Sequence, residues 1–409
     1  MDLNRGSPFE RNPKKTLFFL WIIFFIFIEA GLKSYVRFLD NPPPNPFEHM
    51  EPPGTEISNV LTHHGHIPHS KFTVKPTAHD NYEPVLYEIN SIGIRGPEIG
   101  AKTLPRVLFV GDSFLEANRV IFEKTFSELL NNEFKNQIQF ITHGVSSWAP
   151  TTEFSWIHNV GMSLRPDEIC LFLVWNDFFP AEVTPHTDEV YRELAVWKNG
   201  VPVRYISYQD HECAESPRWC SVKKQLLKIL GRLELAKYFY NGYKKILNLV
   251  SPPMSLETPV LYYSMSMDKW PKKLKINVDH AVDVIARLNA YLKERGVRFY
   301  VTNIPNGLAW KDELVAMKTY NPAWSKIISD SGLTPNEFSV SYAGLEQYLF
   351  YQLTKRGIEW FSLTEAFNKK KKESHELLYI NEDAHWNWRA HKLVFEVLRN
   401  RYKDSQLLR

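Results

Sequence analysis

The succession of short apolar runs and helical segments constrains the fold of this chain more than any other feature. An apolar run such as 106–110 (RVLFV), which stops at Gly111, is typical of a strand buried on both faces. Runs of this kind lie at 106–110, 137–142, 168–175, 297–303 and 358–363. Segments with helical spacing lie at 125–131, 150–160, 278–295 and 388–401. Because strand and helix alternate, the pattern predicts an α/β fold with a central parallel sheet that helices cover on both faces.

Composition excludes several classes of protein. The chain has 409 residues, of which 49 are lysine or arginine and 46 are aspartate or glutamate, so its net charge is +3. This balance excludes a dedicated nucleic-acid binder, which would carry a basic excess on one face. A hydrophobic content of 44% with 23% charged residues is typical of a globular protein rather than a disordered one. Its three cysteines are too few for a disulfide scaffold or a four-cysteine zinc site.

The unbroken apolar run at 17–28, LFFLWIIFFIFI, predicts a membrane anchor. The 17 residues from 16 to 32 contain one acid, Glu29, and reach the lower limit for a helix that spans a membrane. A buried core helix is disfavoured because the few residues before the run cannot cover a helix that is apolar on every side. We therefore expect an anchor at 16–32, with the basic segment 1–15 on the cytoplasmic side.

A cleaved signal peptide is the alternative interpretation of the same run. Its cleavage site requires small residues, whereas 28–31 (IEAG) places isoleucine or glutamate at the critical position. The sequence therefore favours an uncleaved, single-pass anchor. Under both interpretations the rest of the chain lies outside the cytoplasm, in the periplasm.

The remaining residues divide into a spacer, a domain and an insertion. Residues 33–86 begin with dense proline, which favours a stiff spacer over a helix or a central strand. A domain is expected at 87–402, with an insertion at 178–277 that lacks the rhythm of strand and helix. Within the insertion, 222–250 predicts a basic amphipathic helix. Such a helix lies on an anionic membrane surface, or it packs one face and exposes the other.

Polar residues suited to catalysis follow three of the predicted strands, and two more lie in a loop near the C-terminus. Ser113 comes directly after the first strand within Gly-Asp-Ser, Gly144 ends the second, and Asn176 ends the third. In open parallel sheets, functional residues gather at the carboxyl ends of the strands. Asp383 and His385 are two residues apart, so their side chains point to the same side of an extended segment. The pattern therefore predicts a single site that contains all five residues.

Together these residues supply the parts of a nucleophilic acyl-transfer site. Ser113 would attack a carbonyl carbon, His385 would take the serine proton, and Asp383 would fix the tautomer of the imidazole. The oxyanion would be held by the backbone N–H groups of Ser113 and Gly144 and by the side-chain amide of Asn176. This chemistry requires neither a metal ion nor an organic cofactor.

In these residues the chain resembles an SGNH hydrolase of the GDSL class, whose sequence blocks carry Ser, Gly, Asn and His in that order. The matching stretches are VLFVGDSFLEANRV around Ser113, HGVSSWAP around Gly144, WNDF around Asn176 and DAHWNWRAH around His385. The stretch 90–96, NSIGIRG, also resembles one that precedes the domain in some membrane-anchored members. The resemblance extends over 87–177 and 278–398 and leaves the insertion uncovered.

This resemblance implies a three-layer α/β/α, flavodoxin-like sandwich and an esterase that works through an acyl-enzyme. It implies that Ser113 is the nucleophile and that His385 is the base, with Asp383 beside it. Gly144 and Asn176 take the oxyanion positions. From the expected location, the substrate would be an acylated cell-envelope glycan or lipid.

Two other functions remain open. The D-x-H-W sequence at 383–386 also resembles the alginate-type O-acetyltransferases, which use the same triad but pass the acyl group to a sugar hydroxyl. Such an enzyme would need a membrane acyltransferase partner to supply the acyl donor, because one apolar segment cannot form an acyl-transport channel. The third interpretation is a non-catalytic binding module in envelope assembly. The joint presence of Ser113, Asp383 and His385 argues against a module of that kind.

Three further features are interpreted as structural. The histidine cluster consists of His63, His64, His66 and His69. It has no cysteine or acid close by in the sequence, so we expect an exposed segment rather than a metal site. Cys213 and Cys220 lie in one loop, where an extracytoplasmic location would allow a disulfide. The lysine run at 369–372 predicts a solvated face, with contact to an anionic glycan or phospholipid as the alternative.

Overall fold

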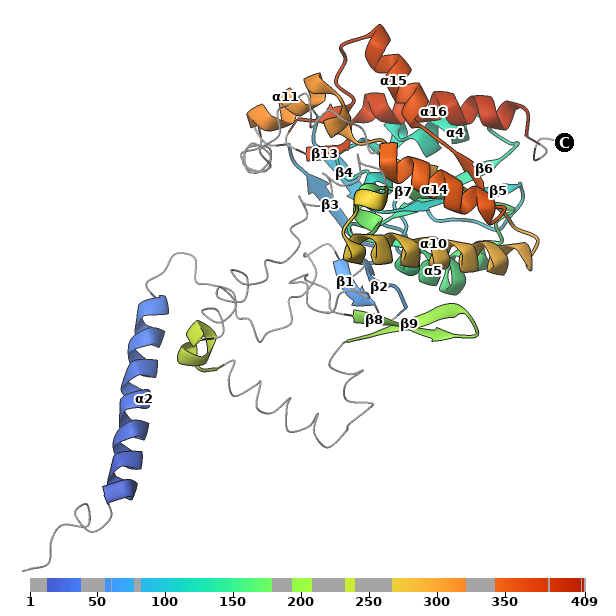
Figure 1. Cartoon of the computed structure of the whole chain (residues 1–409). Helices are drawn as coiled ribbons and strands as arrows, with labels where there is room; N and C mark the ends of the chain where they lie inside the picture. The colour runs from blue at the N-terminus through green and yellow to red at the C-terminus, as the bar shows by residue number, and fades with distance from the viewer. Residues whose placement is uncertain are drawn as a thin grey trace, which may run out of the picture. The chain divides into compact units, whose positions relative to one another are not determined.

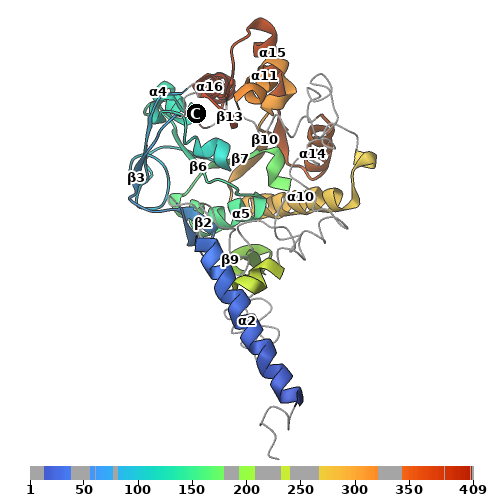
Figure 2. The same cartoon turned by 90° about the vertical axis from the view of Figure 1, so that its left-hand side faces the viewer.

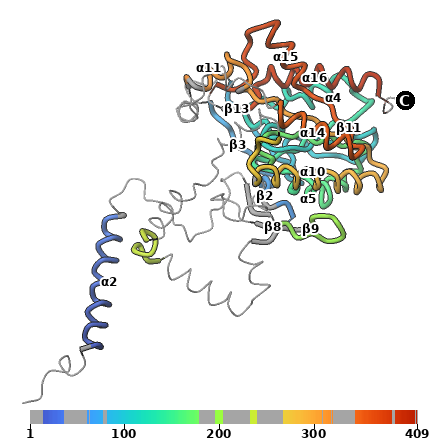
Figure 3. Tube along the Cα trace, in the orientation of Figure 1, coloured from blue at the N-terminus to red at the C-terminus, as the bar shows by residue number. Residues whose placement is uncertain are grey.

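A computed structural model of the whole chain describes residues 13–37, 56–59, 61–76, 82–178, 193–207, 232–239, 267–320, 343–381, 383–405 and 407. Figure 3 draws the other residues in grey. The chain forms two compact units, which are described separately. Their bounds are Met1–Met50 with Gln209–Pro253, and Glu51–Tyr208 with Met254–Arg409. Cys213 and Cys220 lie outside the described residues.

The first unit contains helix α2 (Pro13–Arg37), which includes the predicted anchor (Figure 1). Its segment Lys14–Tyr35 is long and apolar enough to cross a membrane. The Glu29 carboxylate accepts hydrogen bonds from the backbone N–H groups of Glu234 and Leu235, at 2.7 and 2.9 Å. These two residues begin a short helix over 234–239, so part of the predicted insertion contacts α2. Of the helix predicted at 222–250, the structure describes only 232–239.

The second unit is built on a five-stranded parallel sheet, as predicted. Its strands lie in the order β11-β10-β7-β5-β6. Their bounds are β5 Arg106–Gly111, β6 Gln139–Gly144, β7 Glu168–Leu173, β10 Arg298–Asn303 and β11 Glu359–Phe361. Every residue of β5 and β7 is buried, which agrees with their continuous apolar sequence. The register pairs Gly111 with Gly144, so β5 and β6 end side by side.

Helices cover both faces of this sheet and give it three layers. Figure 2 shows α4 and α16 on one side of the strands and α5 and α10 on the other. The helices are α3 Ser113–Glu116, α4 Phe126–Glu133, α5 Pro150–Asn159, α10 Lys272–Lys293, α11 Lys311–Tyr320, α14 Ala343–Lys355, α15 Thr364–Glu373 and α16 Trp388–Lys403. Single 3-10 turns are η1 Phe122–Lys124, η2 Gly161–Leu164, η3 Trp175–Phe178, η4 Met267–Lys269 and η5 Gly307–Ala309. The predicted α/β/α sandwich is therefore confirmed.

The described residues also form four short antiparallel strand pairs outside the sheet. They are β1 (Glu56–Asn59) with β2 (His63–His66), β3 (Lys71–Val74) with β4 (Val85–Glu88), β8 (Glu193–Lys198) with β9 (Val201–Ser207), and β12 (Tyr379–Ile380) with β13 (Asp383–Trp386). The pair β8–β9 lies within the predicted insertion, and α10 begins inside it at Lys272. The predicted catalytic loop at 383–387 forms strand β13 and the N-cap of α16, Asn387.

One prediction about exposure was wrong. The predicted spacer 33–86 contains β1, β2 and β3, and the side chains of His64 and His66 are buried rather than exposed. The Nε2 atom of each ring has a hydrogen-bond partner in the domain, which offsets part of the cost of burying the side chain. In the lysine run, Lys369 and Lys372 are exposed, whereas the side chain of Lys371 is only 4% exposed and pairs with Glu313, 3.0 Å away. That one lysine is part of a buried ion pair.

One edge of the sheet is closed by a side chain. Strand β6 is the last strand on its side, and Asn131 of α4 lies against its first residues. The Asn131 amide donates to the carbonyl of Phe140 at 3.0 Å and accepts from the N–H of Phe140 at 2.8 Å. Both backbone groups of Phe140 are thus engaged by one side chain, in the way a neighbouring strand would engage them.

The close approach of α3 to Gly144 leads to the first prediction. A Cβ atom at Gly144 would lie 2.7 Å from the backbone nitrogen of Glu116 and 2.8 Å from Cβ of Leu115. We expect Gly144→Ala to lower the free energy of unfolding by about 1–3 kcal/mol, because α3 must shift to admit the methyl group. Urea denaturation measures the change. Gly100→Ala is the control, since its Cβ would meet nothing within 4 Å. Equal stability of the two variants would contradict the prediction.

Candidate active site

Ser113 occupies the first position of the short helix α3, where the chain turns sharply after β5. Asp112 caps this helix, because its Oδ1 atom accepts a hydrogen bond from the N–H of Phe114 at 3.0 Å. The other carboxylate oxygen of Asp112 accepts a hydrogen bond from the Ser113 hydroxyl at 3.2 Å. The serine therefore stands at the carboxyl end of a central strand and at a helix N-terminus, with its side chain half-buried.

His385 meets Ser113 across 272 residues of sequence. Its Nε2 atom lies 2.7 Å from the Ser113 Oγ atom, within hydrogen-bond distance. The imidazole packs against the Phe114 ring, with centroids 4.7 Å apart. Burial lowers the pKa of His385 below its ordinary value, and the charge of Asp112 opposes this. The imidazole is neutral at neutral pH, and a neutral imidazole can accept the proton of the serine hydroxyl.

The other predicted residues lie at the same end of the sheet. Asn176 is in η3, directly after β7, and its Nδ2 atom donates to Oδ2 of Asp112 at 3.4 Å. Gly144 ends β6 and packs against α3. The backbone of Asp383 lies in β13, but its side chain is outside what the structure describes. Ser113, His385 and Asn176 are thus brought together with Gly144, and the orienting role of Asp383 remains a prediction.

Three buried carboxyl groups lie beneath the site, and sequence reasoning assigned a role to none of them. They are Asp112, Glu153 of α5 and Asp177 of η3, each fully buried. Burial raises the pKa of all three, and the charges of Glu153 and Asp112 raise that of Asp177 further. Oδ2 of Asp177 accepts a hydrogen bond from the N–H of Val174, whereas neither oxygen of Glu153 has a partner among the described residues. In the sequence, the one signal for a role of Asp112 and Asp177 is that they are the immediate neighbours of Ser113 and Asn176.

The 90–96 stretch supports the catalytic turn from outside. Asn90 accepts hydrogen bonds from the N–H groups of Ile92 and Ile94, at 3.1 and 2.9 Å, which fixes a tight loop. Arg95 projects from this loop and donates to the carbonyls of Ala117 and Val120, at 2.6 and 2.7 Å. These carbonyls lie in the segment that follows α3. The stretch therefore fixes the backbone at 117–120, directly after the helix that begins with Ser113.

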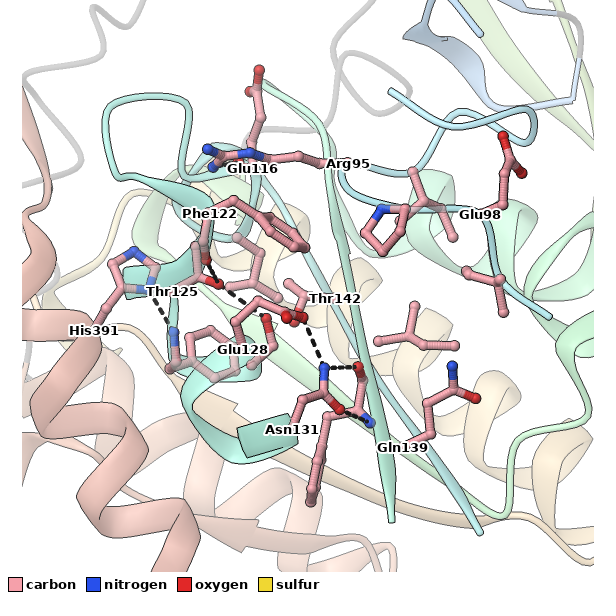
Figure 4. A pocket seen from close by; sticks show the side chains of 18 residues that line it. Arg95, Glu98, Glu116, Phe122, Thr125, Glu128, Asn131, Gln139, Thr142 and His391 are labelled. Atoms are coloured by element: carbon pink, nitrogen blue, oxygen red, sulfur yellow. Dashed lines mark hydrogen bonds between the residues drawn. The ribbon is translucent and has the colours of Figure 1, made fainter. Parts of the chain in front are cut away.

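Two cavities lie near these elements. A cavity of about 90 Å³ between the 94–99 segment, α4 and β6 contains Arg95 and Glu116 at one end (Figure 4). Ser113 and His385 are not among its lining residues. A larger cavity of about 270 Å³ is lined by Tyr82, Glu83, Val85, Arg119, Val120, Ile121, Lys124 and Trp388. Among the described residues, no group of three or more His, Cys, Asp or Glu side chains is arranged to hold a metal ion.

No protein-family profile and no curated protein matches the chain. Among solved structures, it is similar to the psychrotrophic esterase EstA from Pseudoalteromonas sp. (11% identity, 73% of this chain and 96% of that chain, TM-score 0.33). It is also similar to the lipase Lip_vut3 from a goat rumen metagenome (12%, 74% and 99%, TM-score 0.35). A third is a member of the lipolytic G-D-S-L family from Veillonella parvula (9%, 73% and 99%, TM-score 0.34). With identities and TM-scores this low, the interpretation of the site rests on its own residues and their geometry.

The buried carboxyl of Glu153 makes stability depend on pH. Burial raises the pKa of Glu153 in the folded state well above the ordinary value of 4.5. The stability that the neutral carboxyl gives the folded state is therefore fully present below pH 4.5, and it is lost as the pH rises toward the folded pKa. The side chain in the Glu153→Gln variant cannot ionise, so the variant does not lose this stability as the pH rises. Between pH 4.5 and the folded pKa, we expect the variant to gain on the wild type by about 1.4 kcal/mol per pH unit, measured by urea denaturation from pH 4 to 8. A gap that stays constant with pH would contradict the prediction.

Proposed function

We propose that the protein is a serine esterase that hydrolyses ester-linked acyl groups through an acyl-enzyme. The observation that carries the proposal is the 2.7 Å contact between the Ser113 Oγ and His385 Nε2 atoms at the carboxyl end of a parallel sheet. A nucleophile within hydrogen-bond reach of a neutral base is the arrangement that acyl transfer requires.

The reaction proceeds in two halves. The Ser113 oxygen attacks the ester carbonyl carbon while His385 takes the hydroxyl proton, and the tetrahedral intermediate then expels the alcohol, which receives that proton from His385. A water molecule next attacks the acyl-enzyme, again with His385 as base, and releases the carboxylic acid and free Ser113. In both halves the N–H groups of Ser113 and Gly144 and the amide of Asn176 stabilise the oxyanion. Loss of one such donor typically costs about 2.7–4 kcal/mol of transition-state stabilisation.

We place the enzyme in the membrane through α2, with its catalytic domain on the extracytoplasmic side. The length and apolar character of Lys14–Tyr35 support the anchor, and the basic residues before it support the orientation. At this location, acylated envelope glycans and lipids are the esters within reach of a tethered enzyme. They are the substrates that we propose.

The proposal is tested by the release of p-nitrophenol from p-nitrophenyl acetate, with the full-length chain in detergent. We expect steady release by the wild type and a loss of at least about 10³-fold in Ser113→Ala, because no other group forms the acyl-enzyme. Activity that survives in Ser113→Ala would overturn the serine mechanism.

The same assay separates hydrolysis from acyl transfer. If release stops after one equivalent and resumes only when unacylated oligosaccharide is added, the protein is an O-acetyltransferase. Steady release in water alone supports the esterase. If neither acetyl nor longer p-nitrophenyl esters are cleaved and Ser113→Ala retains full biological activity, the protein is a binding module.

The 270 Å³ cavity supports a glycan as the alcohol part of the substrate. Trp388 lines it, lies three residues after His385 and is 38% exposed. Arg119 lines it as well, and its charge reaches His385, where it adds to burial in lowering the pKa. The exposed indole is flanked by Lys124 and Arg389, whose charged groups lie 5.9 and 4.8 Å from its ring. An apolar surface among hydrogen-bond donors suits a sugar ring.

We therefore expect Trp388→Ala to raise KM for an acylated oligosaccharide about tenfold, equivalent to about 1.4 kcal/mol of binding. Its kcat and KM for p-nitrophenyl acetate should stay unchanged, because the small ester does not reach the cavity. Phe350→Ala, which removes an exposed aromatic ring from α14, is the matched control. An unchanged KM for the oligosaccharide would rule out the cavity as the sugar site.

A further inference from the structure

We infer that His66, on a strand before the hydrolase domain, is a positioning residue for the active site, where it acts through Glu116 on the loop that follows Gly144. This inference rests on the proposed esterase function. It concerns residues that none of the four sequence blocks assigns a role. They are two histidines of β2, one glutamate of α3 and one serine of the glycine block.

The first step is the position of Glu116. It is the last residue of α3, the helix that begins with Ser113, and it is 5% exposed. Its Oε2 atom accepts a hydrogen bond from the Ser146 hydroxyl at 2.6 Å, and its Oε1 atom lies 3.3 Å from Nε2 of His66. One buried carboxylate thus joins the nucleophile's helix to the glycine block and to β2.

The second step is the hold on Ser146, which lies two residues after Gly144. Its hydroxyl donates to Glu116, and its carbonyl accepts a hydrogen bond from Nε2 of His64 at 2.6 Å. Since a carbonyl only accepts, Nε2 of His64 carries the proton. Trp148 donates in turn to the carbonyl of His64 at 3.0 Å. The hydroxyl and the carbonyl of Ser146 therefore both have hydrogen-bond partners, and the partner of the carbonyl is His64 of β2.

The third step concerns charge. Burial raises the pKa of Glu116, but the hydrogen bonds from His66 and Ser146 outweigh it, so the net pKa lies below the ordinary value. The group is thus an ionised carboxylate in the interior, and a buried charge is tolerated only with enough donors around it. Removal of His66 takes away one of the two side-chain donors. The carboxylate must then turn toward another donor or take up a proton, and either change alters its bond to Ser146.

The fourth step links this bond to the oxyanion site. Gly144 packs so closely on α3 that a Cβ there would lie 2.7 Å from the Glu116 nitrogen. Ser147, beyond Ser146, has a φ of 63°, a conformation that serine adopts rarely. The loop therefore needs outside support to keep its shape, and the Glu116–Ser146 bond gives that support beside the N–H group of Gly144. A shift of about 1 Å in such a site can lower the rate about 100-fold.

The test compares His66→Leu, His66→Gln and Ser146→Ala with the wild type, as full-length proteins acting on p-nitrophenyl acetate. His66→Leu removes the donor and His66→Gln keeps one at a similar place. We expect His66→Leu to lower kcat about 10- to 100-fold with KM nearly unchanged, and His66→Gln to restore most of the loss. Ser146→Ala should lower kcat in the same way, because it removes the same bond to Glu116 from the other side. His69→Asn, at an exposed position on the same segment, is the control.

A double-mutant cycle completes the test. If His66 acts through Glu116, His66→Leu should add almost no further loss of kcat to Glu116→Gln. Additive losses of kcat, or a kcat of His66→Leu equal to that of the wild type, would overturn the inference. The proposed esterase function would still stand in either case if the wild type shows Ser113-dependent activity. If kcat falls only together with the melting temperature and His66→Gln does not restore it, His66 has a structural role and the inference is wrong. Absence of Ser113-dependent activity in the wild type would reject the proposed function instead.

Discussion

The parallel pairing of β5 with β6 and β7 is the constraint on which the site depends. It aligns Gly111 with Gly144 and brings three strand ends to one edge of the sheet. The turn after β5 can then present Ser113, and His385 reaches it from a strand near the C-terminus. Because the sheet is buried on both faces and its strands cannot slip without exposing apolar residues, these positions are fixed by the core. The catalytic geometry is therefore a consequence of the sheet's register.

The buried carboxyls show how burial and hydrogen-bond donors together set the pKa of an acid. Glu153 has no partner among the described residues and Asp177 has one donor, and burial raises the pKa of both. Burial raises the pKa of Asp112 as well, although Phe114, Ser113 and Asn176 donate to it. Glu116 is equally buried, yet its pKa falls because His66 and Ser146 donate to it. Burial alone thus does not determine whether an acid is ionised. At this site the ionised carboxylate, Glu116, lies on α3, the helix that begins with Ser113. The acids with raised pKa values are Asp112, Glu153 and Asp177.

Much of the fold could be predicted from sequence, because buried parallel strands have continuous apolar runs and sit next to motif residues. The same signals predicted Ser113, His385, Gly144 and Asn176 at one edge. The burial of His64 and His66 could not be predicted. The sequence HHGH has no apolar periodicity, and the partners Ser146 and Glu116 lie 82 and 50 residues away. Interactions that distant leave no local pattern, and the same is true of Glu153 within an ordinary helix.

The amide of Asn131 has a consequence for the protein's behaviour in a crowded compartment. An open edge strand offers a row of unpaired backbone groups to any extended chain that meets it, which is a common start of aggregation. In β6 the second residue, Phe140, has both its backbone groups bonded to Asn131. A foreign strand would have to displace that side chain before it could add to the sheet. One asparagine on a neighbouring helix thus protects the edge closest to the nucleophile's strand against self-association.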